Sequence, residues 1–151
     1  MQQTVEAIRE WFRQCPALSK ENRFGVDHLG ASPTEYAIYL SPTNIRSSVD
    51  IFGKVWIETV QEQNFIFASR EKYSADVLQA LANHGFYDQV IQWIITQNAA
   101  ENFPQIPDGE VISILPTMTQ YLFEAGTNTG RYQISCKLKY RRNTLNARYD
   151  F

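Results

Sequence analysis

The residues that could carry out chemistry are few, and their spacing matches no reaction type. His28 follows Asp27 in a stretch predicted to be a loop, and His84 precedes Gly85 at a predicted helix end. At a helix end, capping and helix-dipole roles are favoured over catalysis for a histidine. No candidate nucleophile accompanies either histidine at a spacing typical of a catalytic family. The sequence therefore predicts no catalytic residue and no enzymatic activity.

Metal and cofactor sites are not predicted either. Cys15 and Cys136 are far apart and lie outside any metal-ligand or redox spacing, so we interpret both as reduced, buried side chains. No cluster of Asp, Glu, His or Cys has the spacing of metal ligands. The seven glycines are scattered as turn residues and form no glycine-rich phosphate loop.

The most regular polar pattern is NTGRYQISCKLKYRR, residues 128–142. Two sets of side chains alternate along it. One set is Tyr132, Ile134, Cys136, Leu138 and Tyr140, and the other is Arg131, Gln133, Ser135, Lys137, Lys139 and Arg141. Alternation with a period of two predicts a strand with one face in a core. The other face must meet water, nucleic acid or another protein.

Charge is unevenly distributed along the chain. Residues 131–151 carry six Lys or Arg and one Asp, a net charge of +5, whereas the preceding 130 residues carry eight bases and fifteen acids, a net charge of −7. A basic end could bind nucleic acid, although the sequence pI of about 5.7 argues against it. It could also contact the acidic part of another copy, because heterologous contacts join two different patches. The third interpretation is a solvated strand face followed by a frayed end.

Composition indicates a globular protein. The 151 residues are enough for one domain with a single core, and the hydrophobic content of 44% is typical of a globular chain. No apolar run approaches the roughly 20 residues that cross a bilayer, and Glu6, Arg9 and Glu10 do not fit a signal peptide. We therefore expect folding in a cytoplasm and no membrane contact.

The first helix and the strands follow from periodicity and turn signals. A helix is predicted over residues 4–14, with Thr4 as its N-cap and an end near Cys15, before Pro16. Strands are predicted over residues 23–26, 34–43, 55–61, 64–69, 111–115, 118–125 and 131–141.

Two further helices are predicted within residues 73–102. The first has Ser74 as its N-cap and carries Val77, Leu78 and Leu81 as its apolar residues, and the pair His84-Gly85 ends it. The second places Phe86, Val90, Trp93 and Ile94 on its inner side.

This order of elements predicts an α+β fold. We expect a mixed, mainly antiparallel sheet with the helices packed on one face. Residues 1–142 would form one domain, and residues 143–151 would be a C-terminal tail that is disordered or becomes ordered on assembly.

Several segments, in their order along the chain, resemble a known class of phage protein. They are VDHLGASPTEYAIYLSPT, NFIFASREKYSADVLQALANHGFYDQVIQWIITQN, FPQIPDG and GRYQISCKLKYRR, and together they cover about residues 23–142. The combination resembles the small minor structural proteins, often labelled minor capsid proteins, of tailed phages and prophages of Gram-positive bacteria. Those proteins are similar to the tail terminators of long non-contractile tails.

The resemblance implies a structural role in the virion, with assembly in the host cytoplasm, and a tail-terminator-like fold. A terminator forms a ring, typically a hexamer, that caps the tail tube, ends tail polymerisation and provides the surface for head attachment. The implied partners are other copies of the chain, the major tail tube protein and a head-completion protein.

The basic strand would then be an assembly surface or would face the lumen, with transient, non-specific contact to DNA. The candidate residues are Arg131, Lys137, Lys139, Arg141 and Arg142. A head-completion or head-tail joining protein is the nearest alternative function, and a small nucleic-acid-binding module is the alternative from another class.

Overall fold

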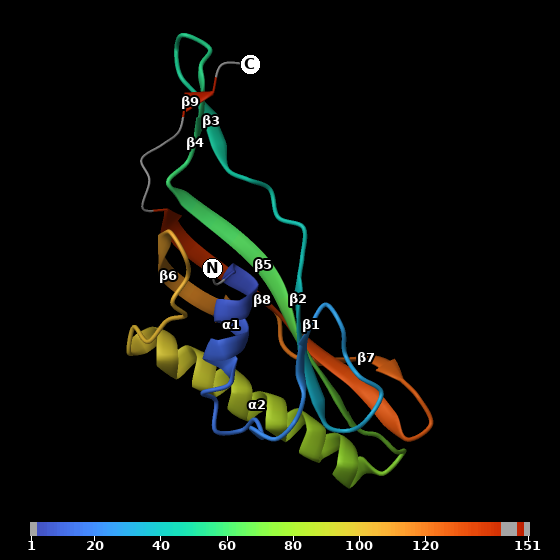
Figure 1. Ribbon diagram of the computed structural model, residues 1–151. Helices are drawn as coiled ribbons and strands as arrows, with labels where there is room; N and C mark the ends of the chain where they lie inside the picture. Colours follow the sequence, from blue (N-terminus) through green and yellow to red (C-terminus); the bar gives the residue numbers. More distant parts are fainter. Residues whose placement is uncertain (1–2, 143–147, 150–151) are drawn as a thin grey trace.

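The computed structural model describes residues 3–142 and 148–149 and shows an α+β fold (Figure 1). In chain order the elements are α1 (Thr4–Phe12), β1 (Phe24–Val26), β2 (Glu35–Leu40), β3 (Ser47–Val49), β4 (Val55–Ile57), β5 (Val60–Lys72), α2 (Val77–Ala99), β6 (Gly109–Pro116), β7 (Tyr121–Ala125), β8 (Thr129–Arg142) and β9 (Arg148–Tyr149). The predicted α+β class is confirmed, and the tail-terminator-like fold stays a prediction.

The larger sheet is mixed and mainly antiparallel, as predicted. Its strand order is β1-β2-β5-β8-β6, and β7 also pairs with β8. Only β1 and β2 run parallel within it. The central strands β5 and β8 are paired along almost their whole length, from Val60 opposite Arg141 to Lys72 opposite Thr129.

Helix α1 forms because its apolar residues recur at helical spacing. Ile8, Trp11 and Phe12 are buried, and the Phe12 ring stacks on Phe67 of β5 at 4.9 Å. The predicted N-cap is wrong by one position, since Gln3 occupies it without a side-chain capping bond and Thr4 is the first helical residue.

Helix α2 corrects the prediction of two helices. Gly85 lies inside a continuous helix, because a helical glycine costs only about 1 kcal/mol relative to alanine and burial of Tyr87, Val90 and Ile94 outweighs that cost. The N-cap is Asp76, whose carboxylate accepts a hydrogen bond from the Leu78 N–H, and not Ser74.

The start of α2 also differs from the expected pattern. Val77, Leu78 and Leu81 were expected on the core side of a helix, yet they are 69%, 73% and 62% exposed. The inner side predicted for the later turns is confirmed, with Val90 and Ile94 fully buried. Periodicity identifies an apolar stripe, but whether the sheet extends beneath that stripe is decided by tertiary structure.

The two helices lie on the same face of the larger sheet and cover it (Figure 1). Their apolar side chains meet those of β2, β5, β6 and β8 in one core. The Trp11 and Trp93 rings join the helices at 4.5 Å, and Trp11 Nε1 donates to the Asn102 carbonyl just after α2. The predicted placement of the helices on one face is therefore confirmed.

The chain between β2 and β5 contains the largest departure from the prediction. The strands expected at 55–61 and 64–69 are β4 and a longer β5, which continues through Glu62 because β8 pairs with each of its residues. The unpredicted strand β3 pairs with β4. This hairpin projects from the body of the protein (Figure 1), and we call residues 45–58 the arm.

Most of the predicted C-terminal tail, residues 143–151, lies outside the described residues. Within it, Arg148–Tyr149 forms β9, which pairs antiparallel with β4 of the arm. The prediction of a disordered or docking tail is not tested further.

The helix-covered face of the sheet also contains polar groups. The Tyr87 hydroxyl donates to the Tyr132 carbonyl at 2.9 Å and lies 2.6 Å from Ser69 Oγ. Glu71 follows on the same face of β5, and its Oε2 is buried with no hydrogen-bond partner among the described residues. Burial raises the pKa of Glu71 to about 7, although the Ser69 hydroxyl opposes the rise.

Candidate assembly surface

The candidate surface lies on the sheet face that the helices leave uncovered. Tyr132, Ile134, Cys136 and Leu138 of β8 are buried in the core on the helix side. The alternate residues of β8, including Lys137 and Lys139, therefore point to the opposite face, as the period-two pattern predicts. The half-buried strand inferred from residues 131–141 is confirmed.

Arg131 is bound within its own chain. Its guanidinium lies 4.5 Å from the ring centroids of Tyr39 and of Phe123, and its Nε donates to Gln133 Oε1 at 3.0 Å. Gln133 is itself buried and donates to the Tyr121 hydroxyl. Cation–π and hydrogen-bond contacts of this kind hold a guanidinium in place, so Arg131 stabilises the subunit.

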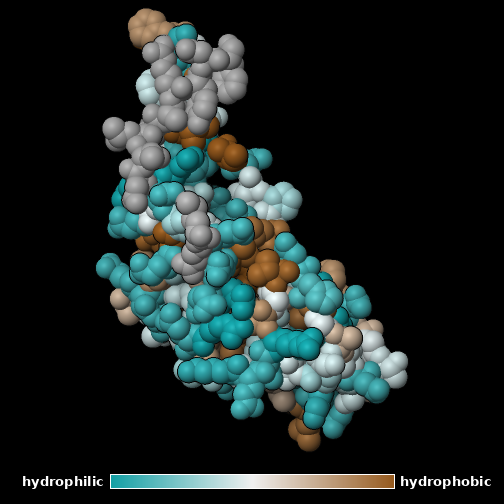
Figure 2. Space-filling view, viewed as in Figure 1, coloured by the Kyte–Doolittle hydropathy of each residue, from teal (hydrophilic) through white to brown (hydrophobic). Residues whose placement is uncertain are grey.

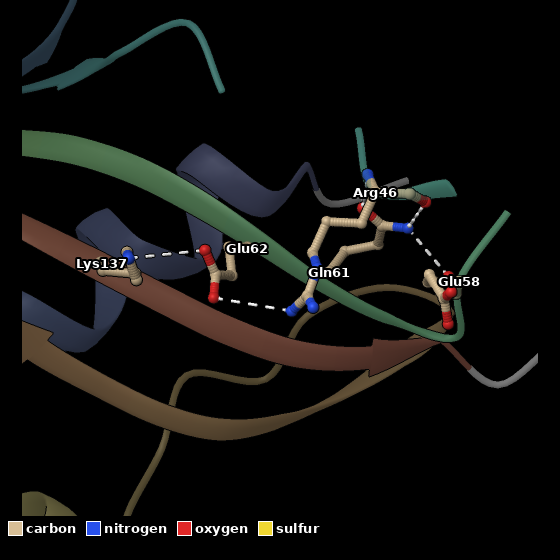
Figure 3. Close-up of polar contacts among 5 residues, drawn as sticks. All are labelled: Arg46, Glu58, Gln61, Glu62 and Lys137. Carbon is tan, nitrogen blue, oxygen red and sulfur yellow. Dashed lines mark hydrogen bonds and ion pairs between the residues drawn. The ribbon is translucent and has the colours of Figure 1, made fainter. Parts of the chain in front are cut away.

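Lys137 also has partners within the subunit. Its Nζ lies 3.4 Å from Glu62 Oε2, and Glu62 Oε1 lies 3.7 Å from Arg46 Nη1 (Figure 3). Glu62 thus connects β8 to the base of the arm. Because all three side chains are partly exposed, each ion pair contributes at most about 1 kcal/mol.

The remaining three candidates form what we call the basic end of β8: Lys139, Arg141 and Arg142. Lys139 is partly exposed, and Arg141 and Arg142 are exposed. No ion pair joins any of the three to another residue in the described part of the chain.

The arm is attached to the body through a glutamine that the sequence analysis missed. Gln61 Oε1 accepts from the Arg46 N–H at 2.8 Å, and its Nε2 donates to the carbonyls of Arg46 and Glu58 at 2.9 and 2.8 Å (Figure 3). Gln61 is 4% exposed, and its side chain provides the hydrogen bonds that join the start of β5 to both strands of the arm at the base. Its position on the core-facing register of β5 is the signal that could have revealed it.

The other chemical predictions concern histidine, cysteine and metal sites. His84 lies inside α2 and not at a helix end; its ring meets the Tyr132 ring edge-on at 5.5 Å. Cys15 and Cys136 are buried free thiols, as interpreted, and burial raises the pKa of both. Among the described residues, no group of three or more His, Cys, Asp or Glu could hold a metal ion.

None of the helices in the described residues is long and apolar enough to cross a membrane. Comparison of the chain with protein-family models and with curated proteins gave no match.

Proposed function

We propose that this protein is a structural virion subunit that caps a phage tail tube as an oligomeric ring, ends tail polymerisation and provides the head-attachment surface. The resemblance of its segments to phage minor structural proteins motivates the proposal. The observation that carries it is the exposed basic end of β8, where Lys139 and Arg141 lie on the sheet face that the helices leave uncovered.

Charge complementarity supports a ring. The basic end belongs to a C-terminal segment with a net charge of +5, whereas residues 1–130 have a net charge of −7. Copies of such a chain attract one another through two different patches, and contacts of that kind close into a ring when the rotation allows. The same cations could instead contact the tube or DNA in the lumen, and each of these contacts would weaken as salt is raised.

The five sequence candidates differ in their contacts within the subunit. Arg131 and Lys137 already have partners within the subunit, so their reversal would remove those contacts as well as any contact with another molecule. Lys139 and Arg141 have no such contacts among the described residues, so the double variant Lys139→Glu/Arg141→Glu should assemble poorly while its monomer stays folded. The control Lys20→Glu/Lys72→Glu reverses two exposed charges elsewhere on the body that make no ion pair among the described residues.

The test is deletion of the gene in the parent phage or prophage, followed by electron microscopy of the particles. Overlong, headless tails are expected, and they should return to normal length with the wild-type gene and the control variant but not with Lys139→Glu/Arg141→Glu. Normal-length tails unattached to full heads would indicate a head-tail joining protein. Ordinary infectious particles from the deletion strain would refute a virion role.

A DNA titration separates the assembly role from a nucleic-acid-binding module. A short fluorescent duplex is titrated with the protein, and polarisation is measured at physiological salt. Weak, salt-sensitive binding without sequence preference agrees with a lumen contact. Tight binding under these conditions would favour the nucleic-acid-binding function instead.

A further inference from the structure

The arm exposes apolar side chains that pack in neither hydrophobic cluster of the described residues. Ile51 and Phe52 are 93% and 81% exposed, and Val49 and Ile45 on the same arm are 65% and 73% exposed. Single apolar side chains on a surface are ordinary, but Val49, Ile51 and Phe52 lie next to one another at the end of one projecting hairpin, which is typical of an interaction site, whereas Ile45 lies at the base of the arm. None of the four belongs to either hydrophobic cluster of the subunit.

The turn at the tip is held in one conformation. The Asp50 carboxylate accepts hydrogen bonds from the N–H groups of Phe52 and Lys54, at 2.9 and 3.0 Å, and from Trp56 Nε1 at 3.0 Å. Gly53 provides the positive φ of 79° that the turn requires. Residues at hairpin tips are usually polar, so an apolar pair in a well-ordered turn indicates a preformed binding element that loses little entropy on docking.

A second exposed apolar patch lies at the end of the body opposite the arm. Val77, Leu78 and Leu81 occupy one stripe of the first turns of α2, and each is more than 60% exposed. We call these three residues the helix-start patch. The start of α2 and the arm tip are at opposite ends of the molecule in Figure 1, and hydrophobic side chains are visible on the arm and at the far end of the body in Figure 2.

We propose that the arm tip of one subunit docks on the helix-start patch of a second copy of this chain. One heterologous contact of this kind covers both apolar surfaces, and it leaves each subunit with a free patch or arm for the next neighbour. A tip-to-tip dimer would leave the helix-start patch exposed to water. The inference rests on the proposed ring function, since it identifies the contact between neighbouring subunits.

The size of the tip predicts a weak contact. If Val49, Ile51 and Phe52 each offer roughly 100 Å² of apolar surface, the tip buries about 300 Å², less than half of the roughly 800 Å² per partner in a standard interface. Isolated subunits should therefore associate only at high concentration.

The experiment is sedimentation velocity of the full chain over a wide concentration range. Wild-type protein should self-associate, and the tip variant Ile51→Ser/Phe52→Ser and the patch variant Leu78→Ser/Leu81→Ser should each weaken association at least 10-fold. The control Ile95→Ser/Met118→Ser, which alters partly exposed apolar side chains elsewhere on the body, should associate as wild type does. Circular dichroism confirms that every variant is folded.

Mixing the variants gives the decisive result. The tip variant keeps an intact patch and the patch variant keeps an intact tip, so together they should form a 1:1 heterodimer that grows no further. Association of the patch variant with itself would show a tip-to-tip contact and overturn the inference. A wild-type protein that stays monomeric up to about 1 mM would also overturn it.

A membrane is the other class of partner that an apolar hairpin tip could meet. Wild-type protein that sediments with phosphatidylcholine–phosphatidylglycerol vesicles through Ile51 and Phe52, and does not self-associate, would refute the docking proposal.

Failure of the docking proposal is distinguishable from failure of the proposed ring function. Overlong tails from the deletion strain would support the ring even if the tip variant associates normally, and ordinary particles would refute the ring even if the mixed variants pair.

Discussion

Replacement of Glu71 by glutamine should make the protein more stable at alkaline pH and should leave its stability near pH 5 much less changed. Glu71 lies on the helix-covered face of β5, where one of its carboxylate oxygens is buried without a hydrogen-bond partner in the described residues. Burial disfavours the charged form and raises the pKa of Glu71 from 4.5 to about 7. Glutamine has nearly the same shape and carries no charge at any pH.

The magnitude follows from the two pKa values. Below pH 4.5 the carboxyl is protonated in both the folded and unfolded states, so its pKa difference costs no stability. Between pH 4.5 and about 7 the unfolded state loses its proton first, so the free energy of unfolding falls as pH rises. At 1.36 kcal/mol per pH unit the full cost above pH 7 is roughly 3 kcal/mol, and partial exposure of Glu71 reduces it to about 2 kcal/mol.

Urea unfolding at pH 5 and pH 8 measures this effect. The buried Trp11 and its neighbour Trp93 provide the fluorescence signal. The stability gained by Glu71→Gln should be roughly 1.5 kcal/mol larger at pH 8 than at pH 5, because the unfolded carboxyl is already mostly ionised at pH 5. A pH-independent change in hydrogen bonding cancels in that difference. The control Glu110→Gln removes an exposed carboxylate from β6 and should show little pH dependence. An equal change at both pH values for Glu71→Gln would refute the assigned burial.

Three further substitutions test the fold. Gly85→Ala should raise the free energy of unfolding by about 1 kcal/mol in a denaturant titration, because its Cβ would meet no atom within 4 Å and alanine favours the helix; a destabilised variant would contradict a continuous α2. Tyr87→Phe should lower it by about 1–2 kcal/mol in the same assay, since the hydroxyl of Ser69 and a carbonyl of β8 lose a buried partner; no change would contradict that network. Gln61→Leu should accelerate amide hydrogen exchange in the arm while the body keeps its protection, and uniform protection would show that the arm does not depend on this side chain.

Features that depend on local periodicity could be predicted from the sequence. The alternation in residues 131–141 identified β8 and its two faces, and the spacing of Ile8, Trp11 and Phe12 identified α1. The α+β class followed from the order of such segments. These predictions succeed because an amphipathic element shows its buried face in its own sequence.

Element boundaries failed where distant contacts override local preference. Gly85 suggested a helix end, but burial of residues on both sides of it maintains α2. Glu62 suggested a connection between strands, but full pairing with β8 keeps it inside β5. Local sequence shows neither effect, because the strands that bury α2 and the strand that pairs with Glu62 include residues far away in the chain.

Alternation along residues 131–141 was enough to predict the basic strand and its polar side. The contacts of its individual cations could not be predicted in this way, because they depend on the folded arrangement of the strands. Tyr39 and Phe123 enclose Arg131, and Glu62 pairs with Lys137, whereas Lys139, Arg141 and Arg142 have no ion pair among the described residues. The physical reason is that a cation's partners come from neighbouring strands, and strand pairing brings together residues that are widely separated in the sequence.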